Sequence, residues 1–181
     1  MLTALLRKRP KSPPPVGEAL YAAVAEQARQ IAFYTDLGVE DRIDARFELY
    51  TLHALLLILR VRDEDRDGPA EGAAAAQSLF DVYVSALDNV LRELGVGDVS
   101  MAKKMRKLGE ALYGRMTAYE GPLRAGDTAA LATNLARNVY VSDEPERAEP
   151  LARYALAARE ALSRQGFADV LAAPVWPEIA A

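Results

Sequence analysis

The sequence predicts an all-α protein built as a single-domain bundle of about six helices, with a short helical turn near its C-terminal end. Alanine and leucine dominate the composition and runs of β-branched residues are scarce, which favours helix over sheet. Apolar residues recur at helical spacing along most of the chain. With 181 residues, 51% of them hydrophobic and 27% charged, the chain can bury a substantial core within one domain.

The N-terminal half of the chain contains three periodic segments. The first helix is expected over residues 18–34, where apolar side chains recur on one face. The second is expected over 44–62 and is apolar almost all round, which is typical of a helix in the middle of a domain. An acidic loop with glycine and proline follows over 63–72, and the third helix is expected over 73–94, ending at Gly95.

The C-terminal half contains three further periodic segments, separated by turn residues. Helices are expected over residues 98–120, 127–141 and 150–164, with a helical turn over 167–171. Asp127 is placed to cap the fifth helix. Gly121-Pro122 either stops the fourth helix or bends its last turn. We expect no strand.

The two ends of the chain differ from its middle, so we expect a tail over residues 1–16, a helical domain over 17–173 and a second tail over 174–181. The N-terminal tail is rich in proline and has a short apolar tip before its cations. These cations are Arg7, Lys8, Arg9 and Lys11. A secretory signal has the opposite order, so we expect no export signal. The cations favour contact with an anionic membrane, at about 1 kcal/mol each; the alternative is a solvated tail.

Composition excludes several classes of site. The absence of cysteine excludes disulfides, thiolate zinc sites, iron–sulfur clusters and cysteine nucleophiles. The net charge of −4 disfavours DNA as a partner. The longest strictly apolar run covers residues 54–59, far short of the ~20 residues of a membrane-spanning helix. We therefore expect no metal, no cofactor and no DNA partner.

Four stretches of the chain, taken together in order, resemble one known family. They are Phe33–Val39; Asp44–Leu49 with Leu52-His53; Leu79–Asp81 with Leu87-Asp88 and Leu91–Asp98; and Lys103–Met105 with Tyr113–Arg115 and Ala118-Tyr119. In this order, over residues 31–124, they resemble the ubiquinol–cytochrome c chaperone family. The chain departs from the family pattern at Ala45, where glycine is usual, and at Ser85, where an acid is usual.

This resemblance implies a helical bundle that acts as a non-catalytic assembly factor for respiratory complex III. It implies that the client is newly made cytochrome b. In the mitochondrial relatives, binding takes place near the ribosome exit and with a small partner protein, so the resemblance implies these partners as well. Together with the basic N-terminal tail, it predicts a cytoplasmic protein that lies peripherally at the inner face of the cytoplasmic membrane.

A polar stripe runs along the second predicted helix. Arg46, His53 and Arg60 are seven residues apart and therefore share one face. The third predicted helix has a matching stripe that consists of Asp81, Ser85, Asp88 and Arg92. If the two helices are antiparallel neighbours, Arg60 faces Asp81, and His53 comes near the serine or the second aspartate. The stripe is either an ion-pair network that fixes register or a polar groove for a client segment.

The fourth predicted helix separates apolar from basic residues. Its apolar face consists of Met101, Met105, Leu108, Leu112, Met116 and Tyr119. Lys103, Arg106 and Lys107 lie opposite that face, and Lys104 and Arg115 flank it. The three methionines are expected to lie in the core, although methionine also suits promiscuous binding surfaces.

The basic face of this helix opposes the net charge of the chain. Between Ser100 and Glu120 there are five cations and two acids. We interpret the cations, together with Tyr113, as a surface that binds a client or partner. Such a surface attracts ribosomal RNA, anionic lipid or an acidic loop. The alternative is an ordinary solvated face.

Nothing in the sequence indicates an enzyme. We find no glycine-rich phosphate loop, nucleophile elbow or metal-ligand cluster, and a lone histidine does not make a metal or haem site. The competing function is a lipid- or quinone-binding protein, or an enzyme, with a pocket in the bundle core. An apolar internal cavity of ~300 Å³ or more would favour that function, and a filled core would favour a binding protein.

Overall fold

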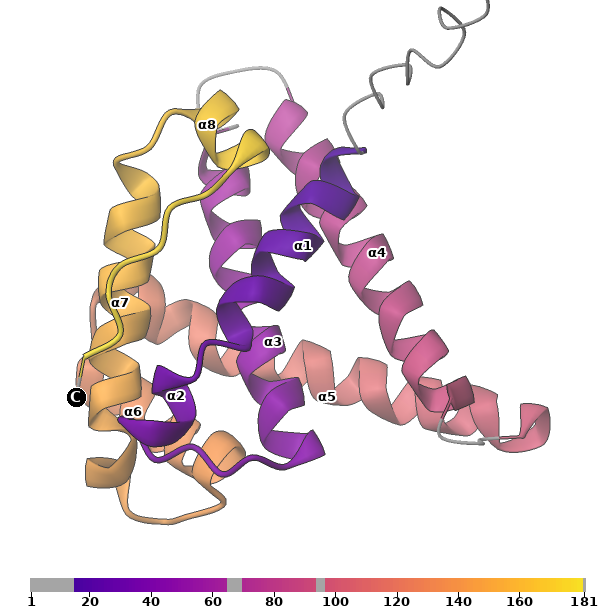
Figure 1. Cartoon of the computed structure of the whole chain (residues 1–181), viewed down its shortest axis with the longest axis horizontal. Coiled ribbons are helices and arrows are strands. Elements are labelled where there is room, and N and C mark those ends of the chain that lie inside the picture. The colour runs from indigo at the N-terminus through magenta and orange to yellow at the C-terminus, as the bar shows by residue number, and fades with distance from the viewer. Residues whose placement is uncertain (1–14, 65–69, 94–96, 181) are drawn as a thin grey trace, which may run out of the picture.

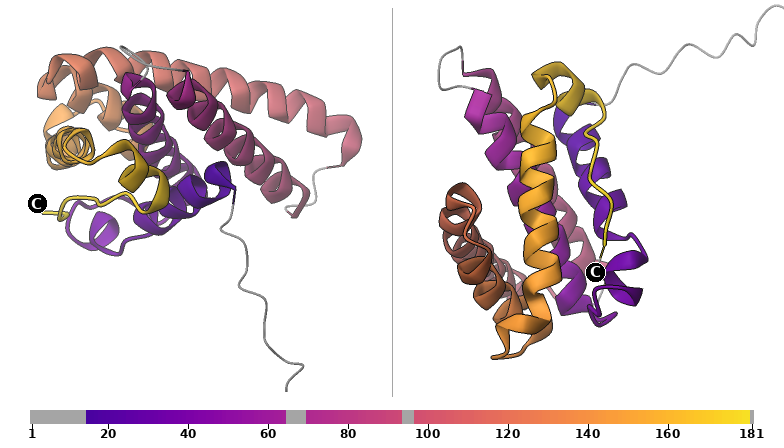
Figure 2. Two further views of the ribbon diagram at one scale, coloured as in Figure 1. Left: turned by 90° about the horizontal axis from the view of Figure 1, so that it is seen from above. Right: turned by 90° about the vertical axis from the view of Figure 1, so that its left-hand side faces the viewer.

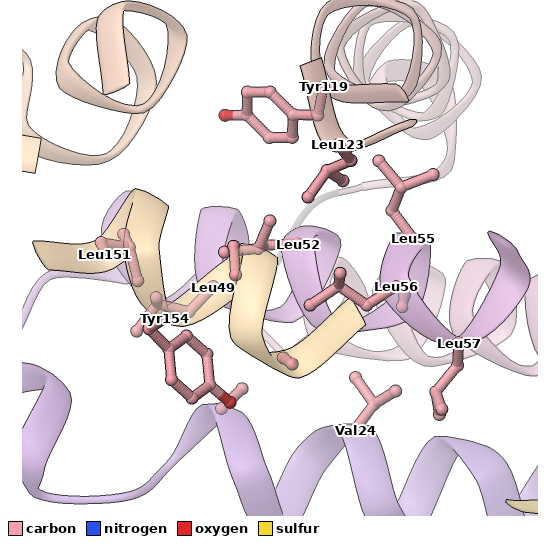
Figure 3. Close-up of a cluster of buried hydrophobic side chains, with 14 of the residues drawn as sticks. Val24, Leu49, Leu52, Leu55, Leu56, Leu57, Tyr119, Leu123, Leu151 and Tyr154 are labelled. Carbon is pink, nitrogen blue, oxygen red and sulfur yellow. The ribbon is translucent and has the colours of Figure 1, made fainter. Parts of the chain in front are cut away.

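Helix α3 (Ile43–Asp63) runs through the middle of the protein, as its apolar sequence predicts (Figure 1). Fourteen of its 21 residues are buried. In the computed structural model, which describes residues 15–64, 70–93 and 97–180, α1, α4, α5 and α7 all contact it. Figure 3 shows its leucines, such as Leu52 and Leu56, lying among side chains of α1, α5 and α7. Burial on several sides explains why the helix needs apolar residues all round.

The described residues form an all-helical single domain and contain no strand, which confirms the predicted fold class. The long helices are α1 (Val16–Ala28), α3, α4 (Glu71–Glu93), α5 (Asp98–Ala125) and α7 (Glu149–Ser163). The shorter ones are α2 (Ala32–Thr35), α6 (Thr128–Leu135), the π-helical turn η2 (Ala136–Tyr140), the 3₁₀ turn η3 (Pro145–Ala148) and α8 (Phe167–Ala172). The Asp127 carboxylate caps α6 as predicted, accepting a hydrogen bond from the Ala130 amide at 2.9 Å.

The first predicted helix is in fact two. α1 ends at Ala28, and the chain turns before the short helix α2. The turn allows Phe33 to be fully buried, with its ring edge-on to His53 and Tyr154 at centroid distances of 5.2 and 4.9 Å. The gain from burying and pairing this aromatic ring favours the break over a continuous helix.

Helix α5 does not end at Gly121-Pro122 but continues to Ala125. Pro122 has no N–H, so the carbonyl of Ala118 one turn earlier lacks its usual donor. The side-chain amide of Asn134 in α6 supplies the missing hydrogen bond, donating to that carbonyl at 3.0 Å. The helix instead ends at Gly126, whose φ of +69° is the left-handed conformation that glycine adopts readily.

The C-terminal half of α4 and the N-terminal half of α5 diverge from the body of the bundle. α4 runs antiparallel to α3, and α5 then returns across one end of the bundle (Figures 1 and 2). The C-terminal half of α5 carries the fully buried Tyr119 and Leu123, which pack in the core. Its N-terminal half extends beyond the other helices, as Figure 2 shows. The fold therefore presents that half of α5 to solvent.

The segment after α8 is extended and packs back along the bundle (Figure 1). The Gln165 side-chain amide donates to the Val175 carbonyl at 2.7 Å and accepts from the Val175 amide at 2.8 Å. The Trp176 ring packs edge-on against His53 at 5.2 Å between centroids. These contacts make the C-terminal segment part of the packed structure.

Candidate functional site

The N-terminal half of α5, residues 98–112, is called the basic arm below. Its exposed cations are Lys103, Lys104, Arg106 and Lys107. Met105 lies between them, and alanine and leucine lie on either side, all strong helix formers, so the arm can be helical without much tertiary support. Arg106 pairs with Glu110 one turn along the helix at 3.8 Å, and both of these side chains are about 70% exposed. An exposed pair of this kind contributes little to stability.

The apolar side of the basic arm is only partly covered. Met101 and Leu112 near its two ends are buried, but Met105 and Leu108 between them are only half-buried. Tyr113, directly after the arm, is 74% exposed. Cations, a flexible thioether and an aromatic ring therefore lie on one accessible stretch of helix. This combination suits the binding of a segment that is both apolar and negatively charged.

Arg115, which the sequence analysis assigned to the binding surface, is held by a buried acid. Its guanidinium donates from Nε to both carboxylate oxygens of Glu48 at 3.0 and 3.1 Å, and from Nη2 to Oε1 at 2.8 Å. The Glu48 side chain is 4% exposed and that of Arg115 28%. Burial raises the pKa of Glu48, and the hydrogen bond from Arg115 opposes that shift. The pair fixes α5 on α3 and thereby positions the basic arm.

The ion-pair network expected between α3 and α4 does not form. α3 and α4 are antiparallel neighbours (Figure 1), but the prediction that Arg60 faces Asp81 is wrong. The Arg60 side chain lies against the C-terminal end of α7, where it donates to the carbonyls of Leu162 and Gln165 at 2.9 and 2.8 Å. Asp81 is exposed and accepts a hydrogen bond from Gln77 of its own helix. Its carboxylate faces solvent, so the two charges are on different sides of their helices.

The other members of the two stripes also have local partners. Arg46 is exposed and pairs with Asp41 through two hydrogen bonds of 2.5 and 2.9 Å. Asp88 pairs with Arg92 one turn along α4 at 2.7 Å. The stripes therefore provide no continuous polar groove between α3 and α4. The expectation that His53 lies near the polar residues of α4 is wrong as well, because the ring faces α7.

His53 is fully buried in a hydrogen-bonded chain of side chains. Gln27 Nε2 donates to the Tyr154 hydroxyl at 2.9 Å, and that hydroxyl lies 2.9 Å from His53 Nε2. His53 Nδ1 lies 2.7 Å from the Leu49 carbonyl. This network assigns the proton to Nδ1, with Nε2 accepting from Tyr154. Burial lowers the pKa of His53 to about 4, so the ring is neutral and structural at neutral pH.

Among the described residues, no group of three or more histidine or acidic side chains is arranged to hold a metal ion. A surface groove of about 420 Å³ lies between α1 and the C-terminal segment, lined by small residues such as Ala22 and by Trp176. The leucines around α3 fill the centre of the bundle (Figure 3). This packing does not favour the lipid- or quinone-binding alternative.

The N-terminal cations Arg7, Lys8, Arg9 and Lys11 lie outside the described residues. Among the described helices, none is long and apolar enough to cross a membrane.

Glu48, which positions the arm through Arg115, is not among the residues predicted from the sequence. Its signal was an acid one turn into an otherwise apolar helix, where an unpaired charge would be costly.

Comparisons with known proteins identify relatives. A family model described as ubiquinol-cytochrome C chaperone matches residues 35–176. The crystal structure of the Cbp3 homolog from Brucella abortus is similar in fold, with a TM-score of 0.79 and 31% sequence identity, covering 91% of this chain and 90% of that one. No curated protein matches the chain. The family match extends well beyond residue 124, so α6 and α7 belong to the shared domain as well.

Proposed function

Because the chain belongs to the ubiquinol–cytochrome c chaperone family, whose members are non-catalytic assembly factors for respiratory complex III, we propose that it binds newly made cytochrome b. The basic arm is the docking surface. The client segment is an apolar helix together with an acidic loop, which the chaperone holds until the complex is assembled. A small partner protein and the ribosome exit region take part, as the family resemblance implies.

The exposure of the basic arm is the observation that carries this proposal. Four cations lie within five residues of one another, on a helix that extends from a chain of net charge −4. Such a cluster attracts a negative segment and speeds its encounter with the protein. The half-buried Met105 and Leu108 then provide adaptable apolar contact. The ion pair of Glu48 with Arg115 holds the arm in place while the client binds.

Charge reversal on the arm tests the docking surface. In the variant Lys103→Glu, Arg106→Glu, Lys107→Glu, three attractive charges become repulsive and no core contact is lost. We expect recovery of cytochrome b with the tagged protein from membranes of the native host to fall about tenfold or more. Assembled complex III and its b haems should fall with it.

A matched control places the same charge change elsewhere. Its substitutions are Arg62→Glu, Arg137→Glu and Arg153→Glu, all at exposed positions. We expect this variant to recover cytochrome b at the wild-type level. Wild-type complex III in the arm variant would show that the arm is not the docking surface. Normal complex III in a gene deletion would contradict the assembly function itself.

We also propose that the N-terminal cations attract the protein to anionic membranes. Removing residues 1–14 deletes four cations and leaves α1 intact. We expect the shortened protein to pellet less with liposomes containing anionic lipid, and salt to reduce the pelleting of the full chain. Liposomes of neutral lipid serve as the control. Equal pelleting of the two proteins would reject this membrane contact.

A further inference from the structure

The end of the molecule that is lowest in Figure 1 exposes large apolar side chains from three different elements. Ile31, directly before α2, is 73% exposed; Ile43, the first residue of α3, is 66% exposed; and Val141, directly after η2, is 68% exposed. Figures 1 and 2 both place these elements at the same end of the bundle. The hydroxyl of Tyr140, the last residue of η2, donates to the Leu37 carbonyl at 2.8 Å, which ties the end of η2 to the segment after α2.

This end is also strongly acidic. We call residues 31–46 and 141–147 together the acidic end. Its acids, all exposed, are Asp36, Glu40, Asp41, Asp44, Asp143, Glu144 and Glu146. Its cations are Arg42, Arg46 and Arg147. The net charge of the acidic end is therefore −4, equal to that of the whole chain, so the remainder of the chain is balanced.

Two of the three arginines are already occupied within the acidic end. Arg42 pairs with Glu40 at 2.7 Å, and Arg46 pairs with Asp41 at 2.5 Å. Neither pair involves the acids that follow Val141. The exposed acids Asp143, Glu144 and Glu146 follow the exposed Val141 within five residues, and Arg147 is the one cation of this segment.

The backbone at Val141 is strained. Its φ is +50°, a conformation that is a genuine outlier for a β-branched residue. The segment before it is a π-helical turn, a form that is rare and frequent at functional sites. A glycine or asparagine would adopt this conformation at lower cost. The protein instead places a valine there and leaves it mostly exposed, so folding gains little from that side chain.

We propose that the acidic end is a second docking surface, which binds a lysine- or arginine-rich segment of a partner protein. The partner segment places an apolar side chain against Ile43 and Val141 while its cations meet the surrounding carboxylates. Negative charge at this end repels nucleic acid and anionic membranes, which leaves a basic protein as the partner that fits. The surface is separate from the basic arm, and the inference does not depend on which client the arm binds.

A defined peptide tests the charge requirement. The probe is a fluorescently labelled amphipathic helix made of leucine and lysine, titrated with the full chain and followed by fluorescence anisotropy. A second peptide with glutamate in place of every lysine is the charge control. We expect the lysine peptide to bind and to weaken with added salt, and the glutamate peptide not to bind. Absence of binding by the lysine peptide, or equal binding of both, would overturn the proposal.

Two variants test the location. The variant Ile43→Ser, Val141→Gly removes the apolar contacts, and glycine relieves the strained φ, so the protein should remain folded. The variant Asp143→Asn, Glu144→Gln, Glu146→Gln removes three carboxylates. We expect each to weaken binding of the lysine peptide about tenfold, with the circular dichroism spectrum unchanged.

The matched control removes three exposed acids from α1 and α4. Its substitutions are Glu18→Gln, Glu71→Gln and Glu93→Gln. We expect it to bind the peptide like the wild type; an equal loss of affinity in this control would overturn the assignment of the site. Sedimentation velocity provides a further check. A dimer that Val141→Gly converts to a monomer would show that a second copy of this chain, and not a basic partner, occupies the surface.

Discussion

Helix α3 and the basic arm of α5 are both rich in leucine, methionine or alanine with interspersed charges. Their charged side chains, however, lie in opposite environments. In α3 the charged side chains Glu48 and Arg60 are buried, and each has defined hydrogen-bond partners. In the basic arm all four cations face solvent. Helices pack on several sides of α3, whereas the arm extends past the bundle (Figure 2).

The comparison shows that the surroundings of a charged side chain determine whether it contributes to stability or to binding. A buried ion is costly unless it is paired, so removing its partner is strongly destabilising. An exposed ion is well solvated, so its replacement changes stability little but changes what the surface attracts. The two regions should therefore respond oppositely to substitution: α3 and its partners through stability, the arm through binding.

The largest effect is expected when the buried pair between α3 and α5 is broken. Arg115→Met leaves the Glu48 carboxylate, which is 4% exposed, without its bidentate partner. We expect a loss of about 3–5 kcal/mol in the free energy of unfolding, measured by urea denaturation. The double variant Glu48→Gln, Arg115→Met should recover much of this loss, because no unpaired charge remains. A loss below about 1 kcal/mol in the single variant would show that the pair is not structural.

A pH titration of stability should reveal the buried histidine. Burial lowers the pKa of His53 from its ordinary 6.5 to about 4, so between these values the unfolded chain binds a proton that the folded chain does not. Stability is fully present above pH 6.5 and is lost as the pH falls towards 4, by about 3 kcal/mol. Urea denaturation at several pH values, compared with His53→Gln, measures this term. Parallel curves for the two proteins would contradict it.

Two glycines allow packed and projecting helices to be compared directly: one lies in α1 and the other in the basic arm. A Cβ at Gly17 in α1 would lie 2.4 Å from the Ser78 carbonyl oxygen of α4, whereas Gly109 in the basic arm has open space around it. We expect Gly17→Ala to destabilise the protein by about 1–3 kcal/mol, because α1 and α4 must separate. Gly109→Ala should stabilise it by about 0.4–1 kcal/mol, since alanine restricts the unfolded chain. Thermal melts of both variants that shift in the same direction would contradict the comparison.

The smallest effect on stability is expected from the arm cations. Replacing Lys103, Arg106 and Lys107 by glutamine should change the free energy of unfolding by no more than about 0.5 kcal/mol each. Urea denaturation provides the measurement. Binding of cytochrome b should nevertheless fall to a level between those of the wild type and the glutamate variant. An unfolded glutamine variant would show that these side chains are structural.

Much of the fold could be predicted from periodicity. The boundaries expected for α3 and α4 are within two residues of those found, because helical periodicity is continuous along each and the segment with Gly68-Pro69 separates them. The errors have tertiary causes. The chain breaks after Ala28 so that Phe33 can enter the core, and α5 passes Pro122 because Asn134 satisfies the freed carbonyl. Neither partner is visible from the local pattern.

The candidate site divides in the same way. That Lys103, Arg106 and Lys107 share one face of a helix follows from the sequence alone. A spacing of three or four residues fixes the direction of their side chains, whatever surrounds the helix. The sequence also determined that Arg46, His53 and Arg60 lie on one side of α3. Which elements pack against those faces depends on the tertiary structure. α7 and the C-terminal segment, about a hundred residues further along the chain, cover His53 and Arg60, because contacts between distant segments depend on how all the helices pack together.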